Sequence, residues 1–336
     1  MKVLASTKHM SREDWLKMRR KGVGGSDAPV ILGLSKYRTA FDLWADKRGL
    51  IEPDEAGEAA DWGHILERPI AERYAKTTGL CVMAWPVMLQ HDERKWQLAN
   101  VDFFIVSPDT PDAVPGEVVD VETLDRTNIA AILEIKTTGI ASRGSANLWE
   151  NDGVPEAYEY QGIHYAAVTG VKHIVYAALV GGRGLTIRER VISPEQIESL
   201  TIAEDAFWLS VLENREPYLV GTKSEEATLK ALYPVSYPKE IEANGFERDL
   251  VNEYLTLKAE ADRLYAKMQN AKNQLINLAG DADTVTFEGQ TLFTYKSTKT
   301  TEAVDLKALE AAHPDLVAQF KKEKAGFRVL RVKGDN

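Results

Sequence analysis

The chain has 336 residues, of which 44% are hydrophobic and 27% charged, and its formal net charge is −10. This composition is ordinary for a soluble globular protein of one large or two smaller domains, and no apolar run approaches the roughly 18 residues that a membrane span requires. The sequence holds one cysteine, Cys81, which excludes an internal disulfide framework and a thiolate metal cluster and favours a cytoplasmic location.

The charges are distributed unevenly along the chain. Residues 1–50 carry eleven Lys and Arg against five Asp and Glu, whereas residues 51–73 carry seven acids against two bases and residues 92–134 ten against three. A basic beginning followed by acidic clusters suits a protein that grips phosphates in one place and divalent cations in another. Unevenly solvated faces explain the same pattern equally well.

The first 80 residues are predicted to be helical, and strands follow. Helices are expected over residues 11–21, 27–33, 39–48 and 61–79, and again over about 155–169 and from Ser193. Strand patterns occur at residues 80–89, 96–106, 129–138, 173–180 and 185–192. This order predicts an α/β domain over residues 1–215, followed by a Pro- and Gly-punctuated linker over residues 216–247.

Residues 248–280 are predicted to form one long helix with a heptad pattern. Apolar residues recur alternately four and three positions apart, at Leu250, Tyr254, Leu257, Ala261, Leu264, Met268, Ala271, Leu275 and Leu278. Such a coiled-coil seam packs against another helix, within or between chains, or against the helix's own domain. Residues 281–336 read as strand, turn, strand, two helices and strand, a small α+β segment.

Glu134 and Lys136 end the apolar run IAAILEIKTT. Side chains two positions apart on a strand point to the same face, and burial of such a pair requires further partners to offset its desolvation. Glu93 and Lys95 have the same spacing, but they lie in a charged turn. The sequence therefore singles out Glu134 and Lys136 as half of a candidate active site.

Asp102 is the expected partner, because it interrupts the apolar stretch NVDFFIV, where an unpaired carboxylate is costly. Asp102 and Glu134 on adjacent strands would bind Mg²⁺ or Mn²⁺, with the Ile135 carbonyl as a further ligand. Lys136 would orient and deprotonate the attacking water or stabilise charge on the phosphate. Glu67 either adds a carboxylate or forms a surface ion pair on its helix.

Five blocks in this order resemble the YqaJ-type viral recombinases, phage relatives of lambda exonuclease within the PD-(D/E)XK nuclease superfamily. The blocks are RRKGVGGSDAPVILGLSKYRTAFDLWADKRG, GHILERPIAERY, NVDFFI, LEIKTT and VPEAYEYQGIHYAAVTG, and the resemblance covers roughly residues 10–215. It implies a restriction-endonuclease-like core, with a mixed central sheet flanked by helices. It also implies that Asp102 and Glu134 are metal ligands, Lys136 the catalytic lysine and Glu67 an additional acidic residue.

The same resemblance implies a pocket for a 5′-phosphate. Its arginine corresponds to Arg19 or Arg20, which stand in tandem here, and its serine to Ser26. Gln161 matches the glutamine of the fifth block, with Tyr158 beside it; without the resemblance, Gln161 reads as a solvent-facing helix residue. Asp27 is expected to cap a helix or to turn toward the metal.

The leading hypothesis is a Mg²⁺-dependent exonuclease that digests linear double-stranded DNA from 5′ to 3′. By resemblance it would form a ring-shaped trimer and supply 3′ single strands to a single-strand annealing protein for homologous recombination. A structure- or site-specific endonuclease on the same fold is the alternative, and it would have no need of the end pocket. A DNA-binding scaffold without catalysis, or a coiled-coil assembly protein, are readings of a different class.

Overall fold

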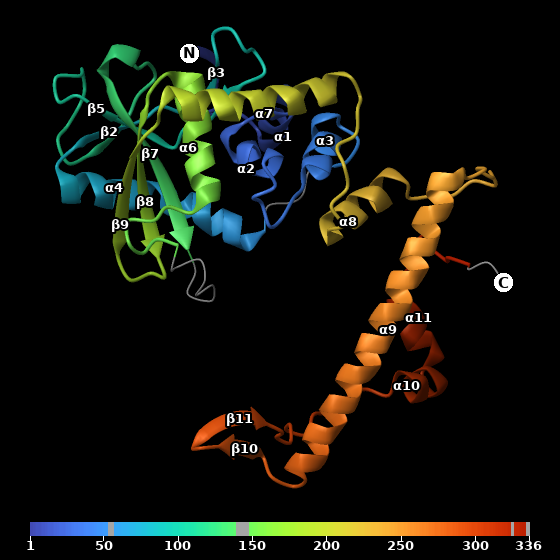
Figure 1. The fold of residues 1–336 in the computed structure, drawn as a ribbon. Helices are drawn as coiled ribbons and strands as arrows, with labels where there is room; N and C mark the ends of the chain where they lie inside the picture. Colours follow the sequence, from blue (N-terminus) through green and yellow to red (C-terminus); the bar gives the residue numbers. More distant parts are fainter. Residues whose placement is uncertain (53–56, 139–147, 324–325, 334–336) are drawn as a thin grey trace. The chain divides into compact units, whose positions relative to one another are not determined.

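A six-stranded sheet in the order β6-β2-β5-β7-β8-β9 organises the chain up to Tyr233 (Figure 1). The computed structural model describes residues 1–52, 57–138, 148–323 and 326–333, which fall into two units, Met1–Tyr233 and Pro234–Asn336. The strands of the sheet are β2 (Cys81–Ala84), β5 (Phe103–Val106), β6 (Val118–Asp120), β7 (Ile129–Thr138), β8 (His173–Val180) and β9 (Leu185–Val191). β2 pairs in parallel with β6, as β7 does with β8, and the other neighbours are antiparallel.

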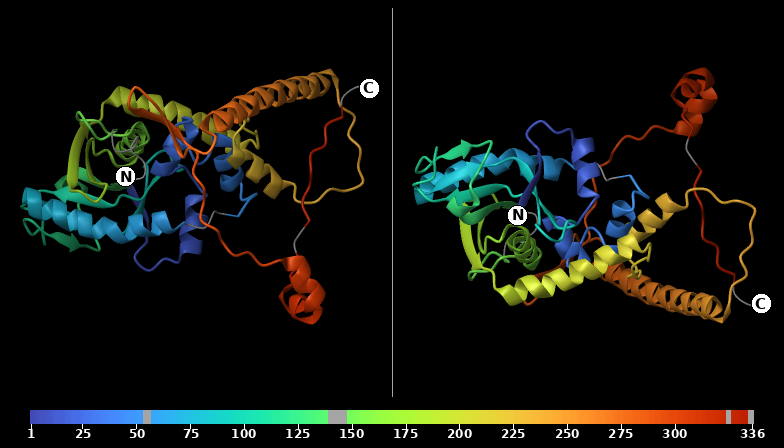
Figure 2. Two further views of the ribbon diagram at one scale, coloured as in Figure 1. Left: turned by 90° about the horizontal axis from the view of Figure 1, so that it is seen from below. Right: turned by 90° about the horizontal axis from the view of Figure 1, so that it is seen from above.

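The principal helices of the first unit are α1 (Arg12–Arg19), α2 (Ala28–Ile31), α3 (Ala40–Lys47), α4 (Glu58–Thr78), α6 (Glu156–Thr169), α7 (Pro194–Leu212) and α8 (Lys223–Leu232). α4 packs on one face of the sheet, where its Tyr74 meets Leu133 and Val175. α6 and α7 cover the other face, and Ile163 of α6 packs there with Ile132. Figure 2 shows α4 and α7 on opposite sides of the sheet. The predicted mixed α/β core is confirmed.

Helix α6 lies very close to strand β8 because residue 162 is a glycine. A Cβ atom at Gly162 would stand 2.1 Å from the hydroxyl oxygen of Tyr176 on β8. That hydroxyl donates a hydrogen bond to the Tyr158 carbonyl at 3.1 Å. Farther along α6, buried His164 contacts Glu204 of α7 at 2.6 Å. These contacts fix the position of α6 on the sheet.

The N-terminal helices form a second core with α7. Phe41, Leu43 and Trp44 of α3 pack with Phe207 and Val211 of α7. Beside this core lies a small antiparallel sheet of β1 (Lys2–Ser6), β3 (Val87–Gln90) and β4 (Leu98–Ala99), of which β1 was not expected from the sequence.

Residues 216–247, predicted to be a linker, contain helix α8. Thr228 of α8 donates a 2.6 Å hydrogen bond to the buried carboxylate of Asp42 on α3, and Glu225 is also buried. The first unit therefore continues to Tyr233 rather than ending at residue 215. The Pro and Gly residues of this segment flank a helix of ten residues, which is too short for its amphipathic pattern to outweigh these turn signals.

The second unit contains helix α9 (Gly245–Ala279), a hairpin of β10 (Thr284–Phe287) and β11 (Gln290–Thr294), and helices α10 (Leu306–Ala312) and α11 (Pro314–Phe320). α9 spans the predicted heptad pattern as one helix of 35 residues. The strand expected at the end of the chain is not formed, because residues 326–333 have no regular secondary structure. None of the helices in the described residues is long and apolar enough to cross a bilayer.

Candidate active site

Glu134 and Lys136 lie side by side on β7, on the face that α6 covers. Alternate residues of β7, such as Leu133 and Ile135, belong to the core under α4, so the strand alternation turns Glu134 and Lys136 the other way. The Glu134 side chain is only 1% exposed, and its Oε1 accepts a hydrogen bond from Lys136 Nζ at 2.5 Å. The buried pair that the sequence suggested is therefore present.

Asp102 lies at a bend directly before β5, not inside a strand as expected. Its neighbour Phe103 pairs with Leu133, which brings Asp102 beside Glu134 of β7. Asp102 Oδ2 accepts a hydrogen bond from the Ile135 amide at 2.9 Å. The bend lets the carboxylate bind a backbone amide of the neighbouring strand while its own strand continues into the core.

Helix α6 contributes Gln161 and Tyr158. Gln161 Nε2 donates to Glu134 Oε1 at 2.6 Å and also lies 2.9 Å from the Tyr165 hydroxyl. Gln161 therefore faces the site rather than solvent. The Tyr158 ring lies under the Lys136 ammonium, whose Nζ is 4.8 Å from the ring centroid, a favourable cation–π contact.

Glu67 approaches the same site from α4. Its Oε2 lies 3.1 Å from Nδ1 of His64, one helical turn earlier. The neighbouring Arg68 binds Asp120 and Glu72. Glu67 lines the same cavity as Asp102.

Burial raises the pKa of all three carboxyl groups, and the charge of Asp102 raises the pKa of the other two further. Burial and the charge of Asp102 raise the pKa of Glu67 to about 7 and that of Glu134 to about 8. Burial likewise raises the pKa of Asp102 above its usual 3.8. Carboxylates crowded in this way favour either a shared proton or a bound cation.

The donor set fits a divalent metal ion. Glu134 Oε2 is buried without a hydrogen-bond partner, and Asp102 and Glu67 add hard carboxylate oxygens of the kind that Mg²⁺ and Mn²⁺ prefer. Lys136 and Gln161 both occupy Glu134 Oε1, so Oε2 is the oxygen left for a ligand. Among the described residues, no three Asp, Glu, His or Cys side chains are placed so that they could hold a metal ion as they stand.

A second cluster forms around Arg19, at the end of α1. Arg19 Nη2 donates to Ser26 Oγ at 2.7 Å and to Asp27 Oδ1 at 3.3 Å, and its guanidinium stacks 4.8 Å from the Trp15 ring. Asp27 also accepts hydrogen bonds from the Gly24 amide and from Lys47 Nζ. Asp27 thus faces cations and a backbone amide, not the acidic site.

The tandem arginines have different positions. Arg20 Nε donates to Asp46 at 3.0 Å, and its Nη2 donates to the Ile51 carbonyl at 2.9 Å. The structure therefore brings Arg19, and not Arg20, together with Ser26.

One cavity of about 700 Å³ joins the acidic site and the Arg19 cluster. Its lining includes side chains from both groups and from the helices between them, among them Arg19, Ser26, His64, Glu67, Asp102, Gln161 and Tyr165. Glu134 lies directly behind Gln161. The acidic site and the Arg19 cluster are therefore reached from the same cavity.

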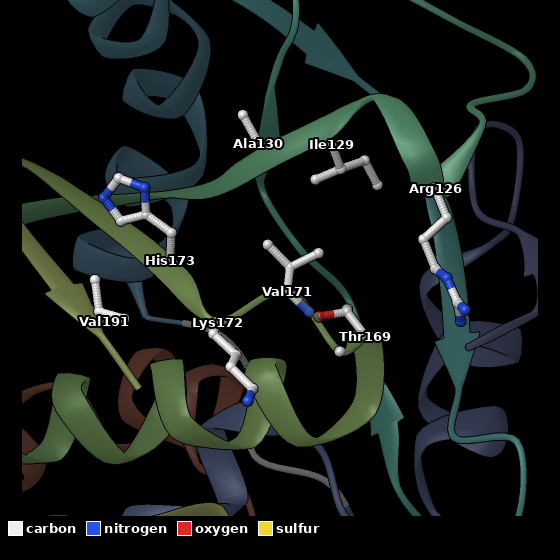
Figure 3. Close-up of a pocket in the computed structure, with 9 residues that line it drawn as sticks. Arg126, Ile129, Ala130, Thr169, Val171, Lys172, His173 and Val191 are labelled. Carbon is white, nitrogen blue, oxygen red and sulfur yellow. Dashed lines mark hydrogen bonds between the residues drawn. The ribbon is translucent and has the colours of Figure 1, made fainter. Parts of the chain in front are cut away.

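Another hollow, of about 530 Å³, lies at the beginning of β7 and β8 (Figure 3). Arg126, Lys172 and His173 contribute to its lining, and none of the described residues lining it is acidic. No predicted site residue lies there.

Three side chains of the candidate site were not foreseen from the sequence. His64 and Tyr165 stand one helical turn from the predicted residues Glu67 and Gln161, a spacing that could have identified them. Lys47 lies 20 positions from Asp27, and no local pattern links the two.

The chain is similar to known proteins over most of its length. Residues 14–172, which include every predicted site residue, match the family described as the YqaJ-like viral recombinase domain. A Bacillus subtilis (strain 168) protein, named only as the uncharacterized protein YqaJ, is 34% identical over 336 residues, covering 98% of this chain and 97% of that protein.

Two crystal structures also align with this chain, at low sequence identity. An alkaline exonuclease from Laribacter hongkongensis is 15% identical with a TM-score of 0.46, covering 66% of this chain and 100% of that chain. A phage related exonuclease from Haemophilus somnus 129PT is 13% identical with a TM-score of 0.41, covering 60% and 99%. Because the Bacillus subtilis relative is similar over nearly the whole of both chains, the chain belongs to the YqaJ-like viral recombinase family.

Proposed function

We propose that this protein is a metal-dependent deoxyribonuclease that degrades linear double-stranded DNA from its 5′ ends. The observation that carries the proposal is the shared cavity, which Glu67 and Asp102 line together with Arg19 and Ser26. The buried pair of Glu134 and Lys136 lies behind its wall, where Glu134 accepts a hydrogen bond from Gln161. Carboxylates with a lysine are suited to phosphodiester hydrolysis, and an arginine with a hydroxyl is suited to holding a terminal phosphate.

In this proposal Asp102, Glu134 and Glu67, with the Ile135 carbonyl, would hold Mg²⁺ or Mn²⁺. The bound ion would supply an activated water and offset the negative charge of the phosphate. Gln161 orients Glu134 by occupying Oε1, so that Oε2 is presented to the ion. Gln161 would therefore fix the orientation of the metal ligand Glu134 before DNA binds.

Lys136 is suited to stabilising charge rather than to accepting a proton. Desolvation lowers its pKa, but the charges of Glu134 and Asp102 act the other way, and the net pKa is raised above 10.5. The ammonium therefore stays protonated at neutral pH. Held by Glu134 and the Tyr158 ring, it would neutralise the charge that develops on the phosphate.

Arg19 and Ser26 are proposed to hold the 5′-phosphate of a DNA end. A guanidinium and a hydroxyl are complementary to phosphate oxygens, and Trp15 and Asp27 keep the guanidinium in place. This pocket favours an exonuclease over the endonuclease alternative, because an internal phosphodiester presents no terminal phosphate.

Recombination by strand annealing is the proposed context. The nuclease would leave 3′ single strands for a separate annealing protein in the cytoplasm and would act as a homo-oligomer, a ring trimer by family resemblance. The α9 seam supports self-association through a coiled coil, because its seven large apolar side chains are 45–67% exposed.

The decisive experiment is a time course with Mg²⁺ on linear duplexes with 5′-phosphate or 5′-hydroxyl ends, beside a closed circle and an EDTA control. The proposal expects mononucleotide release from phosphorylated linear DNA, while the circle stays intact. Cleavage of the circle would favour the endonuclease. Binding without cleavage of any substrate would favour the scaffold.

A further inference from the structure

Lys47 is a buried lysine that the proposed chemistry does not use. It lies at the end of α3, its side chain is 3% exposed, and its Nζ donates to Asp27 Oδ2 at 2.7 Å. The same ammonium donates to the Arg19 carbonyl at 3.0 Å. Lys47 thus contacts both the backbone and the carboxylate partner of the proposed phosphate-binding arginine.

Asp27 makes the role of Lys47 necessary. Its side chain is 6% exposed and lies 3.3 Å from the Arg19 guanidinium, so its charge would oppose a phosphate bound by Arg19. Lys47 supplies a second cation against this one anion. The three side chains together keep a net positive charge, and this charge attracts an anion.

The geometry also separates the tasks of the two cations. Asp27 Oδ2 receives Lys47 and the Gly24 amide, while the Arg19 guanidinium contacts Oδ1 at the longer distance. Without Lys47, Asp27 would be a buried, undercompensated carboxylate, and Arg19 would be the nearest cation left to pair with it. Arg19 would then be drawn away from Ser26.

We propose that Lys47 is a positioning residue that neutralises Asp27 and thereby reserves Arg19 for a terminal phosphate of DNA. This inference rests on the proposed 5′-phosphate pocket and adds to it the residue that gives the pocket its charge. Lys47 itself is buried behind Asp27 and the Arg19 carbonyl, and would not touch the DNA.

The test measures binding, separately from catalysis. Fluorescence anisotropy in EDTA would give the affinity for a short duplex with 5′-phosphate ends and for the same duplex with 5′-hydroxyl ends. The readout is the ratio of the two affinities, which a general loss of DNA binding does not change. Thermal melting of each variant would show that it is folded.

Lys47→Met should lower the affinity ratio about tenfold, the usual loss for one charge-assisted contact. The double variant Asp27→Asn with Lys47→Met removes one anion and one cation together, and should recover most of the wild-type ratio. Lys76→Met, at an exposed position on α4, controls for the loss of a positive charge and should keep the ratio.

The outcomes separate this inference from the proposed function. Equal binding of both ends by the wild-type protein would overturn the phosphate pocket, and Lys47's role with it. A wild-type preference that Lys47→Met preserves would overturn only the role of Lys47. The same holds if the double variant is as impaired as the single one, because the effect would then not come from the charge of Asp27.

Discussion

Gln161 Nε2 donates a 2.6 Å hydrogen bond to Glu134 Oε1, across 27 positions of the chain and between a helix and a strand. Lys136 donates to the same oxygen. The other oxygen of Glu134 is buried and unpaired. Hydrogen bonds to one oxygen thus fix the carboxylate, and the other oxygen is left to bind a ligand. This arrangement is expected of a metal ligand whose orientation is fixed by its neighbours.

Replacing Glu134 by Gln or Lys136 by Met should reduce nuclease activity by about 100-fold or more, because each removes a charge from the reacting centre. The melting temperature should fall little, since both replacements keep the shape of the side chain. Release of acid-soluble nucleotides measures the effect. Glu93→Gln, in an exposed pair of the same spacing, is the control, and full activity in both site variants would refute the site.

Arg19→Gln should abolish the rate advantage of 5′-phosphorylated over 5′-hydroxyl ends, because the guanidinium of Arg19 reaches Ser26 and the cavity. Arg20→Gln should instead lower stability by about 1–3 kcal/mol, since it breaks a part-buried ion pair with Asp46. The same end preference in wild type and Arg19→Gln would remove Arg19 from the pocket.

The free energy of unfolding should fall as pH rises from about 5 to 8 in the absence of divalent ions. Glu67 and Glu134 have folded pKa values of about 7 and about 8, above their usual 4.5. The folded chain therefore binds protons that the unfolded chain releases, and stability declines through that window. In EDTA, the melting temperature of Glu134→Gln should depend less on pH than that of the wild type. An equal dependence on pH in the two proteins would contradict the raised pKa.

Mg²⁺ should raise the melting temperature more at pH 8 than at pH 5.5. Metal binding requires deprotonated carboxylates, so protons compete with the ion at low pH. The variant Asp102→Asn should lose the shift, whereas Asp109→Asn, an exposed control, should retain it. Equal shifts at both pH values would mean that the ion binds elsewhere.

Leu264→Lys should lower the mass of the protein in solution if the α9 seam mediates self-association, because a lysine would enter the apolar seam. Ala266→Lys, on the opposite side of the helix, should leave the mass unchanged. Light scattering after gel filtration measures both. An unchanged mass for Leu264→Lys would separate α9 from any assembly.

Local patterns predicted the parts of the site that lie on one strand or one helix. The spacing of Glu134 and Lys136 on β7 was sufficient to place both on one face, because the alternation of strand side chains is a local rule. The heptad periodicity of α9 predicted that helix in the same way. Asp102 was correctly associated with Glu134, but it lies at a bend, since a short strand need not begin where its apolar run begins.

The contacts made across the fold could not be predicted. Lys47 and Asp27 meet because α3 packs beside the turn after α1, and neither segment carries a sign of the other. The choice between Arg19 and Arg20 likewise depended on which of them Asp46 captures.

Gly162 shows that a residue without any functional group can set the reach of an active-site side chain. The Tyr176 hydroxyl occupies the space where a Cβ atom of residue 162 would lie. The distance between α6 and β8 therefore also determines whether Gln161 reaches Glu134. A Cβ atom at residue 162 would also lie 3.1 Å from Cζ of Tyr176 and 3.2 Å from Cγ2 of Ile174, so the strand as a whole, and not the hydroxyl alone, requires glycine here.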